Sequence, residues 1–172
     1  MMDIQIREYQ DPDYAACRAL FGELTQHHAD IFGDQTIAGE DPGRGFDKFF
    51  SLDNRLGSWV AETDGRIVGF IGLLENMGEE GVCEIEPLVV SLDSRGQGIG
   101  SMLVRYIVEE AKRKRFKFLS IRPELRNEKA FDLYVKLGFN LVGQVELFQD
   151  LLPERGRKWQ SGIEILGHKL RY

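Results

Sequence analysis

Cysteine is scarce in this chain of 172 residues, with Cys17 and Cys83 far apart and no others. Two distant thiols lack the spacing of a metal-ligand set and cannot build a disulfide scaffold, so we expect both to be reduced and structural. Long apolar runs are missing as well, because stretches such as FIGLL at 70–74 are far shorter than the roughly 20 residues of a membrane helix. We therefore expect no metal site and no membrane partner.

Positive charge is in deficit, since 22 Lys and Arg residues face 28 Asp and Glu residues, for a net charge of −6. A nucleic-acid binder gains much of its affinity from Lys and Arg on phosphates, so this balance argues against one. The first residues, MMDIQIREYQDPDY, are acidic and polar where a secretion signal would be basic and then apolar. We expect a cytoplasmic protein whose overall field favours a cationic partner.

No internal repeat, low-complexity tract or Pro- and Ser-rich linker interrupts the chain, so we predict a single domain over residues 1–172. Apolar residues in alternation predict strands, and apolar residues three and four apart predict helices. A long loop is predicted over 29–45, and a hairpin around TDG at 63–65. The predicted strands cover residues 3–9, 58–62, 66–75, 81–90, 116–123, 139–148 and 162–170, and the predicted helices begin near residues 11, 45, 98 and 127.

Proline is also rare, which makes Pro87 in the predicted strand GVCEIEPLVV informative. Proline removes one hydrogen bond from a sheet ladder, so we expect a bulge or a splay at this point. A glycine-rich turn, RGQGIG at 95–100, separates the strand from residues with helical spacing. Unpaired N–H groups and the positive end of the helix dipole converge on such a turn, which predicts a phosphate site. Tight helix packing is the alternative use of these glycines.

Two other phosphate-binding motifs are excluded by the residues around this turn. A P-loop needs Lys and then Ser or Thr after its second glycine, whereas Ile99 and Gly100 follow Gly98. A dinucleotide fingerprint needs G-x-G-x-x-G, but counted from Gly96 the sixth position is Ser101. The turn therefore matches neither of these patterns.

The turn instead resembles the R-x-x-G-x-G signature of the GNAT family of N-acetyltransferases, and NEKAFDLYVKLGF at 127–139 resembles that family's N-x-x-A-x-x-x-Y-x-x-x-G-F motif. This resemblance implies a mixed α/β (α+β) fold. Its largely antiparallel sheet of six to seven strands is splayed between strands four and five and flanked by about four helices. The implied activity is acetyl transfer from acetyl-CoA, the co-substrate, to a primary amine, and a homodimer is left open.

The resemblance also implies which residues contact the co-substrate and which one moves a proton. Tyr134 would donate a proton to the coenzyme A thiolate, although its helical spacing is equally that of a core residue. Asn127 would contact the pantetheine arm, and it is also a good helix N-cap. Backbone N–H groups near 88–90 would polarise the thioester carbonyl. The implied cofactor-binding residues are Leu88, Val89, Val90, Arg95, Gly96, Gln97, Gly98, Ile99, Gly100, Ser101, Asn127 and Tyr134.

An amine nucleophile must lose its proton, and Glu86, beside Pro87, is our preferred general base. The alternatives are that Glu86 belongs to a solvated acidic face, or that this face attracts a cationic substrate. A metal site in HHADIFGD at 27–34 and a covalent role for Cys83 are both disfavoured. The candidate acidic residues for attraction are Asp34, Glu75, Glu79, Glu80 and Glu84.

The acceptor is the least determined part of the prediction. We expect a small cationic amine that reacts directly in a ternary complex, bordered by the loops at 29–45 and 149–161. The alternative enzyme is a protein N-terminal or lysine acetyltransferase. The alternative from another class is a regulatory module that binds acyl-CoA without turnover.

Overall fold

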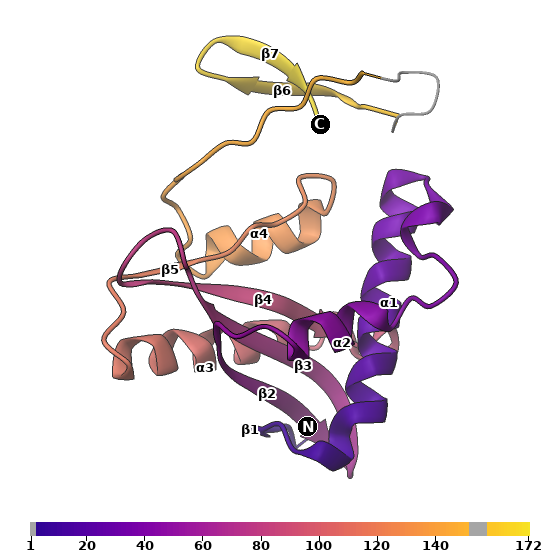
Figure 1. Ribbon diagram of the computed structural model, residues 1–172, viewed down its shortest axis with the longest axis vertical. Helices are drawn as coiled ribbons and strands as arrows, with labels where there is room; N and C mark the ends of the chain where they lie inside the picture. The colour runs from indigo at the N-terminus through magenta and orange to yellow at the C-terminus, as the bar shows by residue number, and fades with distance from the viewer. Residues whose placement is uncertain (1–2, 152–157) are drawn as a thin grey trace.

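Five strands form one sheet, and helices cover both of its faces (Figure 1). The structure is a computed structural model that describes residues 3–151 and 158–172. The sheet order is β1-β2-β3-β4-β5, antiparallel except for the parallel β4–β5 pair. In chain order the elements are β1 Gln5–Glu8, η1 Asp11–Asp13, α1 Tyr14–Phe32, η2 Gln35–Ile37, α2 Arg44–Phe50, β2 Arg55–Thr63, β3 Arg66–Glu75, β4 Val82–Val90, η3 Leu92–Ser94, α3 Ile99–Arg113, β5 Phe118–Ser120, α4 Glu128–Lys136, β6 Ser161–Ile165 and β7 His168–Arg171.

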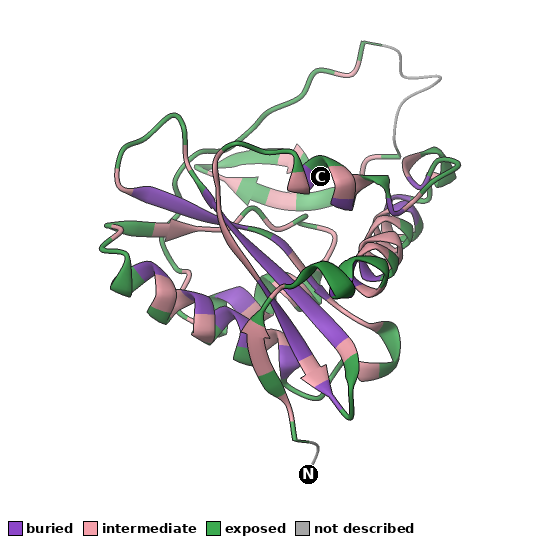
Figure 2. Cartoon of the chain, turned by 60° about the horizontal axis from the view of Figure 1, so that its bottom comes forward, coloured by how far each residue is buried: buried purple, intermediate pink, exposed green. Residues whose placement is uncertain are grey.

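Strand β3 is buried on both faces, as its almost continuous apolar sequence RIVGFIGLLE indicates. Phe70 faces one apolar cluster, in which residues of α1 and α2 such as Cys17 and Phe46 pack. Ile71 faces the other cluster, which includes Leu103 of α3 and Tyr134 of α4. The sheet therefore lies between two helical layers, and Figure 2 shows its buried residues concentrated in the central strands.

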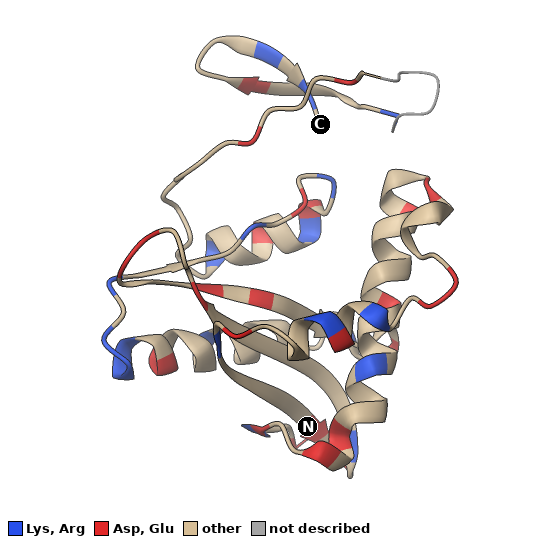
Figure 3. Cartoon of the chain, in the orientation of Figure 1, with Lys and Arg blue, Asp and Glu red and all other residues tan. Residues whose placement is uncertain are grey.

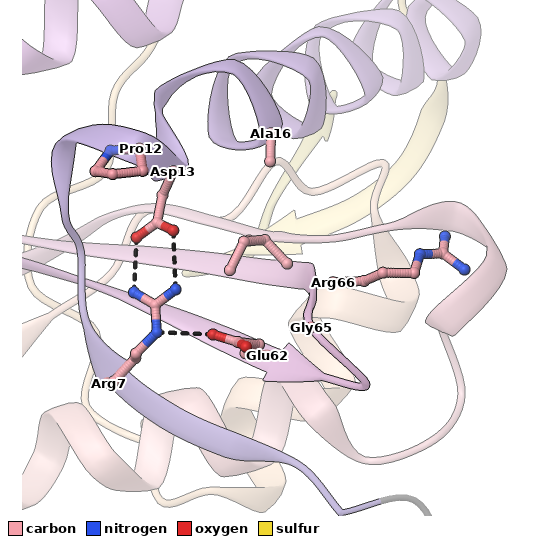
Figure 4. Close-up of a pocket in the computed structure, with 8 residues that line it drawn as sticks. Arg7, Pro12, Asp13, Ala16, Glu62, Gly65 and Arg66 are labelled. Atoms are coloured by element: carbon pink, nitrogen blue, oxygen red, sulfur yellow. Dashed lines mark hydrogen bonds and ion pairs between the residues drawn. The ribbon is translucent and has the colours of Figure 1, made fainter.

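One arginine fixes the start of α1 to the sheet. Arg7 of β1 donates two hydrogen bonds to Asp13, at 2.7 and 2.8 Å, and one to Glu62 of β2 at 2.7 Å (Figure 4). The hydrogen bond from Arg7 holds the pKa of the buried Asp13 carboxyl below its ordinary value. Arg7, Asp13 and Glu62 line a surface pocket, and their charges are already paired with one another.

Most of the predicted elements are present, with shifted ends. The β2–β3 hairpin turns at Asp64 and Gly65, as the TDG signal predicted. The first helix continues to Phe32 because Ala29 and Phe32 extend its buried side, so residues 29–32 of the predicted loop are helical instead. None of the helices in residues 3–151 and 158–172 combines the length and apolar character that a membrane span requires.

The predicted strand count is wrong for the described part of the chain. The main sheet has five strands rather than six to seven, and residues 139–148 form no strand. The segment 162–170, predicted as one strand, is instead a hairpin of β6 and β7 outside the main sheet. It turns at Leu166 and Gly167, whose φ angles of 51° and 82° are the left-handed values of a tight hairpin turn. A leucine gives no signal for such a turn, which explains the missed break.

Gly72 of β3 lies against β4 where proline interrupts that strand, and this contact generates a stability prediction. A β-carbon at Gly72 would clash with the carbonyl oxygen of Glu86 and come within 2.5 Å of the Phe49 ring. We expect Gly72→Ala to lower the free energy of unfolding by about 1–3 kcal/mol, because the overpacked backbone must move. Urea unfolding followed by circular dichroism measures the change. Gly143→Ala is the control, since a β-carbon there meets no atom within 4 Å; equal losses would contradict the prediction.

Candidate functional site

A gap opens between β4 and β5 because their ladder is short. The two strands pair only at three positions, the last being Glu84 with Ser120, while β4 continues to Val90 alongside β3 alone. The β3–β4 register also shifts between Ile71 and Leu73, opposite Glu86 and Pro87, which confirms the predicted irregularity at the proline. Residues 85–90 therefore present one backbone edge to the gap.

The predicted cofactor residues on β4 lie on this free length. Val89 is buried, and its side chain belongs to the cluster on the α1 and α2 side. Leu88 and Val90 are half-buried and pack against the opposite cluster, which includes α3 and α4. Side chains on both faces thus hold the strand in place, and its backbone groups toward β5 are left for another partner.

The glycine turn after β4 has the conformation that its sequence predicted. Gly96 and Gly98 have φ angles of 77° and 83°, a region that side chains with a β-carbon rarely adopt. Helix α3 begins at Ile99, and within the described residues no side chain caps its N-terminus. Its first N–H groups have no helical acceptor, so they and the helix dipole make the turn attractive to an anion.

Side chains of the turn tie it to the end of β4. The Arg95 guanidinium donates a hydrogen bond to the carbonyl oxygen of Val90 at 3.2 Å. The Gln97 amide donates to the carbonyl oxygen of Asp93 at 3.3 Å. These contacts tie the turn to the end of β4, and neither of them uses the first backbone N–H groups of α3.

Gly100 shows that the two predicted motifs meet in space. A β-carbon on Gly100 would lie 3.4 Å from Leu133 of α4 and 3.8 Å from Val90 of β4. The first turn of α3, which includes the half-buried Ser101, therefore borders both β4 and α4. Because Gly100 has no side chain, α3, α4 and β4 can approach one another closely beside the gap.

Helix α4 carries the two polar residues predicted in the second motif. The Asn127 side chain caps α4 by accepting a hydrogen bond from Ala130 N–H at 3.2 Å, as expected of a good N-cap. Tyr134 is 8% exposed, and its ring lies 6.1 Å from that of Phe139. Burial raises the pKa of Tyr134 to about 12, so the phenol keeps its proton at neutral pH. Core packing and proton donation are therefore compatible roles for one side chain.

Helix α1 reaches the same region, through residues that the sequence motifs did not identify. The Glu23 carboxylate accepts a hydrogen bond from Leu92 N–H at 2.8 Å, at the start of the turn. Burial and, to a lesser extent, Arg95 lower the pKa of His27, against the raising effect of a hydrogen bond with Asn127. Glu23 and His27 are four residues apart on one face of the helix, which is the sequence signal that could have linked them.

An ion-pair group spans the gap where β4 and β5 separate, and Figure 3 shows its acidic residues along β4. Arg122, just beyond β5, donates two hydrogen bonds to Glu84 at 2.5 and 2.8 Å. The same guanidinium lies 3.7 Å from the Glu86 carboxylate. The partial desolvation of Glu86, followed by the Glu84 charge, raises the pKa of Glu86, while Arg122 lowers it and the net shift is upward. Arg122 was missed because nothing local in FKFLSIRP indicates its partner.

The predicted acidic face is not one surface. Glu84 is only 7% exposed and is paired with Arg122, so it is not part of a solvated face. Glu79 and Glu80 lie in the turn between β3 and β4, while Asp34 follows α1 at the opposite side of Figure 1. Because these carboxylates lie in different parts of the structure, they cannot attract a cation together as one local group. Of the acidic residues predicted for this face, Glu84 and Glu86 lie at the gap.

Neither cysteine has the properties of a nucleophile. Burial raises the pKa of Cys17 to about 12 and that of Cys83 to about 11, so both thiols are protonated at neutral pH. Cys83 also donates to the carbonyl oxygen of Phe118 at 3.6 Å, within the β4–β5 ladder. In residues 3–151 and 158–172 there is no group of three His, Cys, Asp or Glu side chains with the geometry of a metal site.

Comparison with protein families identifies a match that covers most of these elements. The model of the acetyltransferase (GNAT) family matches residues 15–139. An uncharacterized N-acetyltransferase of Methanocaldococcus jannaschii is 29% identical over 114 residues, which are 56% of this chain and 50% of that protein. N-acetyltransferase 8 of Rattus norvegicus is 33% identical over 108 residues, 61% of this chain and 48% of that protein. The chain thus spans about half the length of these curated relatives.

Solved structures share the fold at low sequence identity. An aminoglycoside N-acetyltransferase in complex with CoA has a TM-score of 0.65 at 17% identity, covering 88% of this chain and 97% of that one. A ribosomal-protein-alanine N-acetyltransferase of Brucella melitensis has a TM-score of 0.64 at 23% identity, covering 81% and 86%. These similarities show that the chain has the same overall fold as those enzymes.

Proposed function

Because the chain belongs to the acetyltransferase (GNAT) family, whose co-substrate is acetyl-CoA, we propose that it transfers an acetyl group to a primary amine. One observation carries this proposal: the uncapped N-terminus of α3 opens beside the free backbone edge of β4. The first feature suits a pyrophosphate, and the second suits an extended, amide-containing arm. Together they offer both kinds of contact that such a co-substrate needs.

The residues of this site divide naturally between the parts of acetyl-CoA. N–H groups of 96–101 would bind the pyrophosphate, with Arg95 beside them. The free edge at 88–90 would pair with the pantetheine amides and polarise the thioester carbonyl. Asn127 would contact the same arm from the start of α4. When bound, acetyl-CoA supplies the activated acetyl group, and the protein orients it.

Two side chains would move the protons of the reaction. An amine of pKa about 10.4 must be neutral to attack, which costs about 4.6 kcal/mol at pH 7. In direct transfer the amine nitrogen forms a bond to the acetyl carbon, and the bond from that carbon to sulfur breaks. Glu86 takes the amine proton, directly or through water, and its raised pKa makes it a better base than an ordinary carboxylate. Tyr134 gives a proton to the departing thiolate.

A small cationic amine is the acceptor that the charges at the gap favour. Glu84 and Glu86 already engage one organic cation, the Arg122 guanidinium, at distances of 2.5–3.7 Å. Glu86 is 55% exposed at its side chain, so an incoming ammonium group can approach it from solvent. The loop at 33–43, which follows α1, could border the acceptor. The second predicted border, 149–161, includes residues 152–157, which lie outside the described part of the chain.

Tyr134→Phe tests the general acid, because it removes the hydroxyl and keeps the buried ring. We expect turnover to fall on the order of 100-fold or more, while the thermal midpoint changes little. Steady-state kinetics with thiol detection measures the rate, and circular dichroism checks the fold. Tyr106→Phe is the matched control, since this half-buried tyrosine of α3 packs against Trp59 of β2, with the two ring centroids 6.0 Å apart. Wild-type turnover in Tyr134→Phe would leave the residue with a packing role alone.

Glu86→Gln tests the general base through the pH dependence of the rate and the pH dependence of the stability. Turnover at neutral pH should fall, and the rising limb of the rate profile should move to higher pH, because only solvent then accepts the amine proton. A raised carboxyl pKa also means that ionisation of Glu86 destabilises the fold as the pH rises. The variant should therefore gain stability relative to the parent from about pH 4.3 upward and match it below.

Glu80→Gln is the control for that experiment, because Glu80 is exposed in the β3–β4 turn. It should change neither the rate profile nor the relative stability. If Glu86→Gln has the same rate profile as the parent protein, the assignment of Glu86 as base is wrong, whatever the stability result.

An acetylation screen over amine classes, measured by thiol release at several ionic strengths, tests the acceptor. For a small polyamine-like cation we expect KM to rise and kcat to stay nearly constant as the Debye length falls from about 30 to 8 Å. Glu86→Gln should weaken this salt response, and Glu79→Gln, in the distant turn, should not. Acetylation of peptide amines alone would favour a protein acceptor, and acetyl-CoA binding without any thiol release would favour a binding module.

A further inference from the structure

Helix α1 connects the glycine turn to the start of α4. Near its middle, the Glu23 carboxylate accepts the hydrogen bond from Leu92 N–H at 2.8 Å, where the turn begins. At its end, the Phe32 ring has the Arg126 guanidinium 4.7 Å from its centre, and Figure 1 shows this end of α1 beside the loop that enters α4. His27 lies between these two contacts, one helical turn after Glu23 on the same face. It therefore faces the region between the turn and α4.

His27 contacts the residue that caps α4. Its half-buried side chain forms a hydrogen bond with Asn127, and this bond acts to raise the pKa of His27. A bond with that effect favours the protonated ring, so a ring N–H donates and the amide oxygen of Asn127 accepts. The same oxygen accepts from Ala130 N–H at 3.2 Å, and its two lone pairs allow both bonds. The amide is thereby oriented so that its NH₂ group can donate to a carbonyl group of the pantetheine arm.

Positive charge surrounds His27, although the net charge of the chain is −6. Burial, and then the charge of Arg95 in the turn, lowers the pKa of His27, and Lys129 of α4 adds to this effect. Asp30, on the same helix as His27, acts in the opposite direction. Lys129 lies in the first turn of α4, where the helix dipole also disfavours a cation. His27 is therefore neutral at neutral pH, beside two cations that an anion would stabilise.

A bound pyrophosphate reverses the balance of charge at this place. Its two phosphate groups each carry a negative charge, and the turn proposed to bind them includes Arg95. With Arg95 and Lys129 balanced, the added negative charge favours the protonated form of His27. Protonated His27 still donates to Asn127, and a hydrogen bond from a charged donor is stronger than one from a neutral donor. Phosphate binding and the orientation of Asn127 thus support each other.

We propose that His27 is a positioning residue of the co-substrate site: it orients the Asn127 amide toward the pantetheine arm, and it takes up a proton from solvent when the pyrophosphate occupies the turn. This inference rests on the proposed acetyl-CoA site and does not depend on the acceptor. In the free protein His27 titrates below its ordinary pKa of 6.5, and in the complex it titrates higher. Affinity is therefore constant at alkaline pH and rises as the pH falls through the pKa of the complex.

Calorimetry of the unmodified protein with dephospho-CoA, in buffers of different ionisation enthalpy, measures the proton directly. Dephospho-CoA keeps the pyrophosphate and the pantetheine arm, and it lacks the 3′-phosphate, a monoester that would itself titrate near pH 6. We expect about half a proton to be taken up per bound ligand at pH 6.5, and an affinity about fivefold higher at pH 6 than at pH 8.

Two substitutions separate the hydrogen bond from the charge. His27→Gln keeps an N–H donor that cannot gain a proton, so it should bind dephospho-CoA like the parent at pH 8 and show no proton uptake. His27→Ala removes the donor as well, and its affinity at pH 8 should fall about threefold or more. His28→Gln is the matched control, because His28 points about 100° away around the helix and is influenced by Glu124. It should keep the proton uptake of the parent, and circular dichroism verifies the fold of all three variants.

The outcomes distinguish this inference from the proposed function. Binding of dephospho-CoA without net proton uptake, or equal uptake in His27→Gln and the parent, would overturn the protonation of His27 and leave the acetyl-CoA site standing. Equal affinities of His27→Ala and the parent at pH 8 would overturn its positioning role. If neither dephospho-CoA nor acetyl-CoA binds the parent, the proposed function is wrong, and the inference fails with it.

Discussion

The parallel strands β4 and β5 stay together for three residue pairs and then part, because Glu84 is the last residue of β4 with a partner on β5. Beyond that point β4 still pairs with β3, but the backbone groups on its other edge need another partner, since unpaired polar groups inside a protein are costly. The interruption at Pro87 and the glycine turn at 95–100 both lie within this unpaired length or directly after it. The site therefore lies where the backbone groups of β4 no longer have a neighbouring strand on the β5 side.

The separated strands are still connected, by side chains rather than by backbone. Arg122 bridges from the end of β5 to Glu84 and approaches Glu86, so one guanidinium balances two carboxylates on the neighbouring strand. A buried Glu84 without Arg122 would be an uncompensated charge. The same pair sets the electrostatic surroundings of Glu86, which joins the stability of the gap to the chemistry proposed there.

Local patterns predicted the parts of the site that depend on neighbours in sequence. The left-handed glycines 96 and 98, the start of α3 and the Asn127 cap of α4 are each determined within a few residues. The pairing of Glu84 with Arg122 joins positions 38 residues apart, and the contact of Glu23 with Leu92 joins positions 69 apart. No periodicity reports such contacts, because they depend on how whole elements pack. The alternating pattern at 139–148 shows a second limitation of sequence patterns. It indicates which side chains would share a face of a strand, but not which strand the segment would pair with.

The double burial of β3 has a consequence for synthesis on the ribosome. Residues 1–75 contain α1, α2 and the first three strands, so the Phe70 face can be covered as soon as this part has emerged. The Ile71 face packs against α3 and α4, which end only at Lys136. One side of the nascent sheet therefore stays uncovered for the time needed to make about sixty further residues, which is several seconds at about 5–20 residues per second. During that interval the growing chain has its greatest need of a chaperone.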